Sequence, residues 1–146
     1  ALEGGALGCL TARERESYRP DRFYIKEAST QRALRDLAAS HTPADLDTLR
    51  ALQRQAEEAP DTAALAQALF RYHRGVTFLS GNTITPLLFN AFMQVNLEFW
   101  SGYIRSVGRE ESLRTLARFT DLIAAGQGDR AAQLLDDGLR RFVTTL

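Results

Sequence analysis

The chain of 146 residues is poor in several chemically useful residue types, and each shortage excludes a class of protein. Cys9 is its only cysteine, so no disulfide can form within the chain and a reducing compartment is the simpler expectation. Neither charge is in excess, because 18 Lys and Arg residues balance 18 Asp and Glu residues. A domain that binds nucleic acid by itself normally has a basic excess that neutralises phosphates. This chain alone is therefore not expected to bind DNA.

Long apolar runs are also missing. The most apolar stretch, residues 84–100, is interrupted by polar residues, so no transmembrane helix is expected. The first 20 residues lack the basic and apolar regions of a secretory signal. A hydrophobic content of 45% and a charged content of 25% are ordinary for a globular domain. We therefore expect a cytoplasmic protein without membrane contact, with residues 1–20 as a linker or lead-in segment before a domain at 21–146.

Prolines and glycines divide this domain into pieces of helical length. The expected helices cover about 21–41, 43–59, 61–80, 84–107, 109–126 and 129–145. Thr42 before Pro43 is typical of a helix N-cap. Asp61, Thr85 and Asp129 are the corresponding candidates for later helices.

Hydrophobic periodicity agrees with this division. Leu65, Leu69, Tyr72, Val76 and Leu79 recur at steps of three and four, as on one face of an amphipathic helix. The 84–107 segment is apolar on most faces, which is typical of a helix surrounded by others. No segment alternates with period two between hairpin turns, so strands are not expected. The sequence predicts an all-α antiparallel bundle of about six helices around a central apolar helix.

Residues for catalysis or metal binding are scarce. No nucleophile elbow or phosphate-binding glycine loop is present, and His41 precedes a helix cap, where a surface position is expected. His73 lies beside an apolar stripe and is expected to face the interior. Asn90, Gln94 and Asn96 lie in the apolar 84–107 segment, where buried amides either bond to neighbouring helices or line a cavity. An enzyme is not expected, nor is a transition-metal site, which needs three or four converging ligands.

The segment His73-Arg74-Gly75-Val76-Thr77-Phe78-Leu79-Ser80-Gly81-Asn82, followed by an apolar helical stretch, resembles the effector-binding C-terminal domain of FadR-type GntR-family transcriptional regulators. The Thr-Pro-Ala-Asp-Leu start at 42–46 and the Ala-Ala-Gly turn at 124–126 also fall in the expected places. The resemblance implies a helical bundle that encloses a small effector. It also implies a homodimer that binds DNA through an N-terminal winged-helix domain, which these residues do not contain.

Two departures from the family pattern guide the ligand prediction. Many members bind a metal through an Asp, a His four residues later and two further His. Here His73 matches the first His, but Leu69 occupies the Asp position, and no His lies around Leu116 to Arg118 or Gly138 to Arg140. Lys26 stands where many members place an effector-contacting Arg, and it keeps the charge without the planar fork.

These departures predict a metal-free site for a small organic anion, similar to the fatty acids or acyl-CoA of the fatty-acid-responsive branch. The candidate ligand-binding residues are Lys26, Arg71, His73, Asn90, Gln94 and Arg118, with no metal and no cofactor. Phe92, Met93 and Trp100 are the candidates for packing against its apolar part. The main alternative is a helical interaction module with a packed core and no ligand, and a small helical enzyme is a third class.

Overall fold

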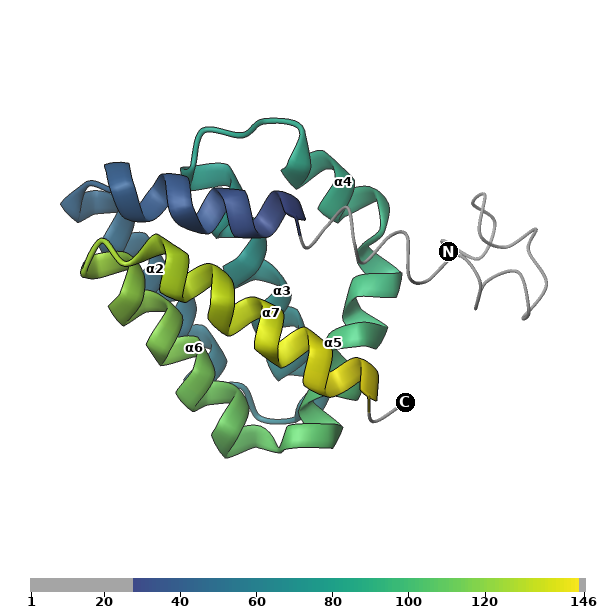
Figure 1. The fold of residues 1–146 in the computed structure, drawn as a ribbon. Coiled ribbons are helices and arrows are strands. Elements are labelled where there is room, and N and C mark those ends of the chain that lie inside the picture. The colour runs from purple at the N-terminus through teal and green to yellow at the C-terminus, as the bar shows by residue number, and fades with distance from the viewer. Residues whose placement is uncertain (1–27, 145–146) are drawn as a thin grey trace.

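The computed structural model describes residues 28–144, with side chains through residue 141, as a bundle of seven helices without strands in that range. The first described helix covers 28–40. It is followed by α2 (Pro43–Glu57), α3 (Thr62–Leu79), α4 (Thr85–Ala91), α5 (Met93–Val107), α6 (Arg109–Ala124) and α7 (Gly128–Thr144). The all-α bundle predicted from the sequence is confirmed (Figure 1). No helix within 28–144 has the length and apolar character needed to cross a membrane.

Two of the four predicted N-caps are confirmed. The Thr42 side chain accepts a hydrogen bond from the Asp45 amide, and the Asp45 carboxylate accepts one from the Thr42 amide, which forms a capping box. The Asp61 carboxylate accepts from the Ala64 amide at 2.8 Å. These side chains satisfy amides that the first turns of α2 and α3 would otherwise leave open.

The predictions for Thr85 and Asp129 are wrong. Asn82 supplies the side chain at the start of α4, because its Oδ1 accepts from the amides of Ile84 and Thr85 at 3.0 and 2.9 Å. Helix α7 begins one residue earlier than expected, so Asp129 lies inside its first turn. There its carboxylate accepts a hydrogen bond from Arg35 Nε at 3.0 Å and joins α7 to the first helix.

The predicted single helix over 84–107 is two helices, which is a second correction. The backbone leaves the helical region at Phe92, where φ is −110° and ψ is 26°. Phe92 still donates to Leu88 and accepts from Asn96, so the hydrogen bonds continue while the chain changes direction from α4 into α5 (Figure 1). A central apolar helix is present, but it is α3, which packs against α2, α4 and α5.

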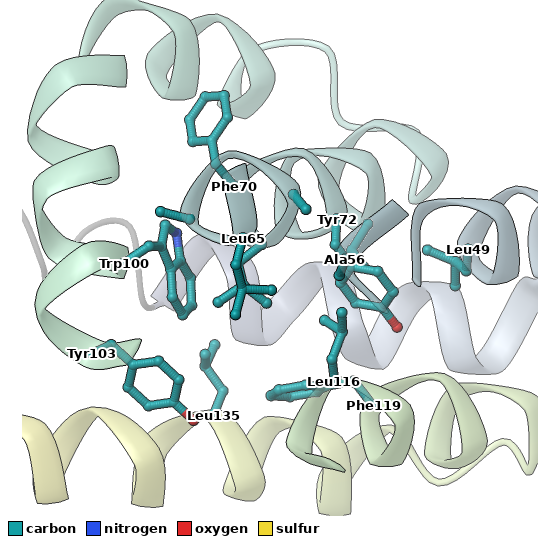
Figure 2. Packing of buried hydrophobic residues seen from close by; sticks show 14 of the residues in the cluster. Leu49, Ala56, Leu65, Phe70, Tyr72, Trp100, Tyr103, Leu116, Phe119 and Leu135 are labelled. Carbon is teal, nitrogen blue, oxygen red and sulfur yellow. The ribbon is translucent and has the colours of Figure 1, made fainter. Parts of the chain in front are cut away.

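The core is built around α3 (Figure 2). Leu65, Leu69, Tyr72 and Val76 of its predicted stripe are fully buried, and Leu79 is partly buried. The packing continues to α4 through Phe70, whose ring lies 5.9 Å from that of Phe89. Removing this apolar surface from water stabilises the bundle by about 25 cal/mol per Å² of buried area.

Candidate functional site

A small, partly open space lies where α3, α5, α6 and α7 meet. Its volume is about 20 Å³, which is close to the room that one water molecule needs. Figure 2 shows side chains from α5, α6 and α7 directed toward this part of the interior. The cavity is lined by Leu69, His73, Trp100, Tyr103, Ser112, Thr115, Leu116, Phe119, Leu134, Leu135, Gly138 and Leu139.

His73 is the most distinctive residue of the cavity. It is 2% exposed, as its position beside the apolar stripe predicted. Its imidazole stacks on Trp100 with a centroid distance of 4.7 Å and an interplanar angle of 3°. The rings of Tyr72 and Phe119 approach it edge-on at 5.5 and 5.3 Å. Aromatic contacts on several sides fix the orientation of the imidazole, since offset and edge-to-face ring pairs are directional.

Two buried phenols lie close to His73. The Tyr72 hydroxyl and Thr120 Oγ1 are 2.7 Å apart and share a hydrogen bond. Burial raises the pKa of Tyr72 well above its ordinary value. Burial also raises the pKa of Tyr103, although its hydrogen bond with Thr115 opposes that shift. Both phenols therefore stay neutral near pH 7 and act as hydrogen-bonding groups rather than charges.

The rest of the lining supplies few polar groups. The Ser112 hydroxyl donates to the backbone carbonyl of Gly108 at 2.7 Å, so its hydrogen bond is made within the first turn of α6. No Asp, Glu, Lys or Arg belongs to the residues that line the cavity. The nearest charges that act on Tyr103 are those of Glu111, which raises its pKa, and Arg141, which lowers it. The cavity is therefore mainly aromatic and aliphatic.

The metal positions of the resembled family converge here, but the residues do not fit a metal. Leu69, Leu116, Gly138 and Leu139 all line the same space as His73. None of these four can donate a lone pair from its side chain, and a transition metal needs three or four nitrogen, sulfur or carboxylate ligands. Within 28–144, no group of three or more His, Cys, Asp or Glu residues could hold a metal ion.

Of the predicted ligand-binding residues, the structure places only His73 in this cavity. Arg71, Asn90, Gln94 and Arg118 are exposed and do not line it. Lys26 lies outside the described residues. The expectation that the amides of Asn90 and Gln94 are buried is wrong, whereas Asn96 is 4% exposed, as expected.

The sequence reasoning missed the walls that α6 and α7 contribute. Ser112, Thr115, Leu116 and Phe119 follow the i, i+3, i+4, i+7 spacing of one helix face. Residues 134, 135, 138 and 139 are spaced i, i+1, i+4 and i+5, which also places them on one side of α7. This periodicity was available as a signal, but it marks any core-facing helix and does not single out a cavity.

Ligand pockets of helical bundles commonly lie between helices, and this space, with its aromatic walls and one buried imidazole, occupies such a position. A comparison with protein-family models finds the FCD domain over residues 30–141. The chain therefore belongs to the FCD domain family, the C-terminal domain of FadR/GntR-type regulators. This is a family of effector-binding regulatory domains and not a family of enzymes. A search of the curated proteins and a search of the solved structures each gave no match.

Proposed function

We propose that this domain senses a small organic acid with apolar bulk, without a metal, and that the ligand enters between α3, α5, α6 and α7. Binding would then change the DNA affinity of a homodimer through a winged-helix domain attached to this one. The observation that carries the proposal is the buried imidazole of His73, placed on an aromatic wall at the point where the four helices converge.

The lining favours the apolar part of such a ligand. Aromatic rings and leucines form most of the wall, and buried apolar contact gains about 25 cal/mol per Å². His73 and the neutral phenol of Tyr103 are among the polar groups of the lining that a ligand would contact. A carboxylate needs a partly desolvated cation. Because Arg71 and Arg118 are exposed and do not line the cavity, Lys26 is the predicted candidate that this proposal retains.

Ligand entry requires one wall to move, because ligand pockets usually measure about 300–1,000 Å³. Helix α7 has one firmly attached end. At Gly128, an added Cβ would lie 2.7 Å from the Cα of Arg35, and Asp129 is paired with the Arg35 side chain. At Gly138, farther along α7, an added Cβ would meet no atom within 4 Å. We infer that the part of α7 around Gly138 shifts outward while its first turn stays in place.

Thermal denaturation tests this proposal, since a ligand that binds only the folded state raises stability by mass action. Decanoate and decanoyl-CoA should raise the melting temperature, and decanamide, which has no negative charge, should raise it less. Lys26→Ala should reduce the rise. Gly138→Leu should abolish it by filling the cavity, whereas Gly138→Ala, the matched control, should retain it.

Metal ions provide the second arm of the test. Micromolar zinc or nickel should not reproduce the stabilisation by the acids. A saturable, metal-dependent rise that is lost in His73→Ala would contradict the metal-free site. The absence of a response to any apolar acid would contradict the proposed ligand class.

A second candidate function is an interaction module without a ligand. The observation that favours it is the small volume of the cavity, about 20 Å³, which leaves the bundle closely packed. This candidate predicts that Gly138→Leu changes stability but that no apolar acid shifts the melting temperature of any variant.

A further inference from the structure

Helix α4 is apolar on both of its faces, and the described chain covers only one. Thr85, Pro86 and Phe89 face the core and are buried. Leu87 and Leu88 lie on the other face, where they are 65% and 42% exposed. A helix that is apolar all round normally packs against neighbours on all sides. The outer face of α4 therefore has the composition of an interior surface.

The segments directly before and after α4 in the chain also expose large apolar side chains. Figure 1 shows α4 and the loop before it at an edge of the bundle. We call this region the α4 corner; its large, partly or mostly exposed side chains are Phe78, Ile84, Leu87, Leu88, Phe92 and Met93. Their exposed fractions run from 38% to 69%. At about 200 Å² per large side chain, the corner exposes roughly 600 Å² of apolar surface.

The size of this exposed apolar area is typical of an interface rather than of a chance feature of the surface. Large apolar patches on monomers measure about 300–600 Å² and are often functional. A standard protein–protein interface buries about 800 Å² on each partner. About 65% of a homodimer interface is apolar, so roughly 600 Å² of apolar surface corresponds to a face of about 900 Å² on each partner.

Charge identifies the kind of partner. Residues 75–97 contain no Asp, Glu, Lys, Arg or His, although the whole chain has 18 acidic and 18 basic residues. Such a surface offers nothing to the phosphates of a nucleic acid or to a charged peptide. In a two-fold dimer, by contrast, each patch meets its own copy, so an uncharged patch avoids like-charge repulsion.

We propose that the α4 corner is the self-association face of this domain and that its occupant is a second copy of the chain. The inference deepens the proposed function, on whose homodimer it rests, by assigning the contacting surface. The two copies bury their apolar corners against each other around a two-fold axis. Core helices α3 and α5 flank the corner, so the face is held by the packed part of the bundle.

Sedimentation velocity of the full 146-residue chain, from low micromolar to near-millimolar concentration, tests the assignment. Ile84→Glu and Leu87→Glu place a charge at side chains that are 69% and 65% exposed, so the fold should be retained. Each should raise the dissociation constant of the dimer by at least about tenfold, because a buried unpaired charge is costly. Gln55→Glu on the exposed surface of α2 makes the same charge change and should leave the dimer unaltered.

Two results would overturn the proposal. A wild-type dimer that neither corner variant weakens would place the interface elsewhere, while the proposed sensing function would stand. A wild-type chain that stays monomeric, and whose melting temperature falls in Leu87→Glu, would mean that the chain itself covers the corner. Failure of apolar acids to bind would overturn the proposed ligand instead and leave the dimer result intact.

Discussion

The His73 cavity and the α4 corner are both rich in apolar side chains and share helices α3 and α5, but they differ in what covers them. Around the cavity, aromatic residues from α3 and α5 meet α6 and α7, and Phe119 is 3% exposed. At the corner, residues from α3, α4 and α5 meet no further described helix, and Phe78 is 66% exposed. Apolar composition alone therefore does not distinguish a core from a contact surface.

The difference lies in the polar groups that accompany each region. Buried hydrogen bonds such as that between Tyr72 and Thr120 accompany the enclosed region and specify how its helices meet. The exposed side chains of the corner are purely apolar, apart from the weakly polar sulfur of Met93. We infer that the first region is completed by the chain itself and that the second is completed by association.

The largest expected effect compares one residue type in the two regions. Phe119→Ala should lower the free energy of unfolding by about 3–5 kcal/mol, because it removes a buried ring and leaves a cavity. Phe78→Ala should change it by less than about 0.5 kcal/mol when the chain is dilute, since the ring is mostly exposed. Urea denaturation monitored by circular dichroism measures both.

Protein concentration sharpens this comparison. The loss of unfolding free energy caused by Phe78→Ala should increase with protein concentration, because the dimer buries that ring. The loss caused by Phe119→Ala should stay constant. If Phe78→Ala changes the free energy of unfolding by the same amount at every protein concentration, the assignment of the α4 corner is contradicted.

The helices were predictable where local chemistry decides them. Thr42 and Asp61 cap their helices through their own side chains, and the stripe from Leu65 to Val76 is buried as its spacing predicted. These features depend on residues within a few positions of one another, so sequence spacing contains the information.

The break at Phe92 was not predictable in the same way. Neither glycine nor proline lies at the bend, so no local signal marks it. Asn90 and Gln94 are four residues apart and are both exposed, whereas Asn96, two residues beyond Gln94 in α5, lies on the opposite face and is buried. Because this segment is apolar on most faces, its sequence does not indicate which face turns toward the core.

The second prediction concerns alkaline pH, and it applies to the enclosed region alone. Burial raises the pKa of both Tyr72 and Tyr103, while in the unfolded chain a tyrosine loses its proton near pH 10. Above about pH 10, the folded state therefore binds more protons than the unfolded state, and stability falls as the pH rises. The stabilising contribution is complete below that pH.

Each such tyrosine should steepen the fall by about 1.4 kcal/mol per pH unit. Urea denaturation from pH 8 to pH 11 should show a smaller slope for Tyr72→Phe than for the wild type. Leu87→Ala is the control, because residues 75–97 contain no titratable side chain, and its slope should match that of the wild type. An unchanged slope in Tyr72→Phe would mean that this phenol titrates normally in the folded protein.

The smallest expected effects are those of replacing two glycines by alanine. One glycine lies beside the α4 corner and the other lines the cavity, and their backbone conformations differ. Gly81 ends α3 beside the α4 corner with φ at +86°, although an added Cβ would meet no atom within 4 Å. Gly81→Ala should therefore lower the free energy of unfolding by about 1 kcal/mol through backbone conformation alone.

Gly138 lines the cavity within α7, where an added Cβ would also meet no atom within 4 Å. Gly138→Ala should stabilise the protein by about 0.5–1 kcal/mol, because alanine loses less backbone entropy in a helix. Urea denaturation should therefore show a lower free energy of unfolding for Gly81→Ala and a higher one for Gly138→Ala. That result would mean that Gly81 is needed for its backbone conformation, whereas the cavity has room for a side chain at position 138. A loss of stability in Gly138→Ala would instead mean that the wall of α7 is already closed around that position.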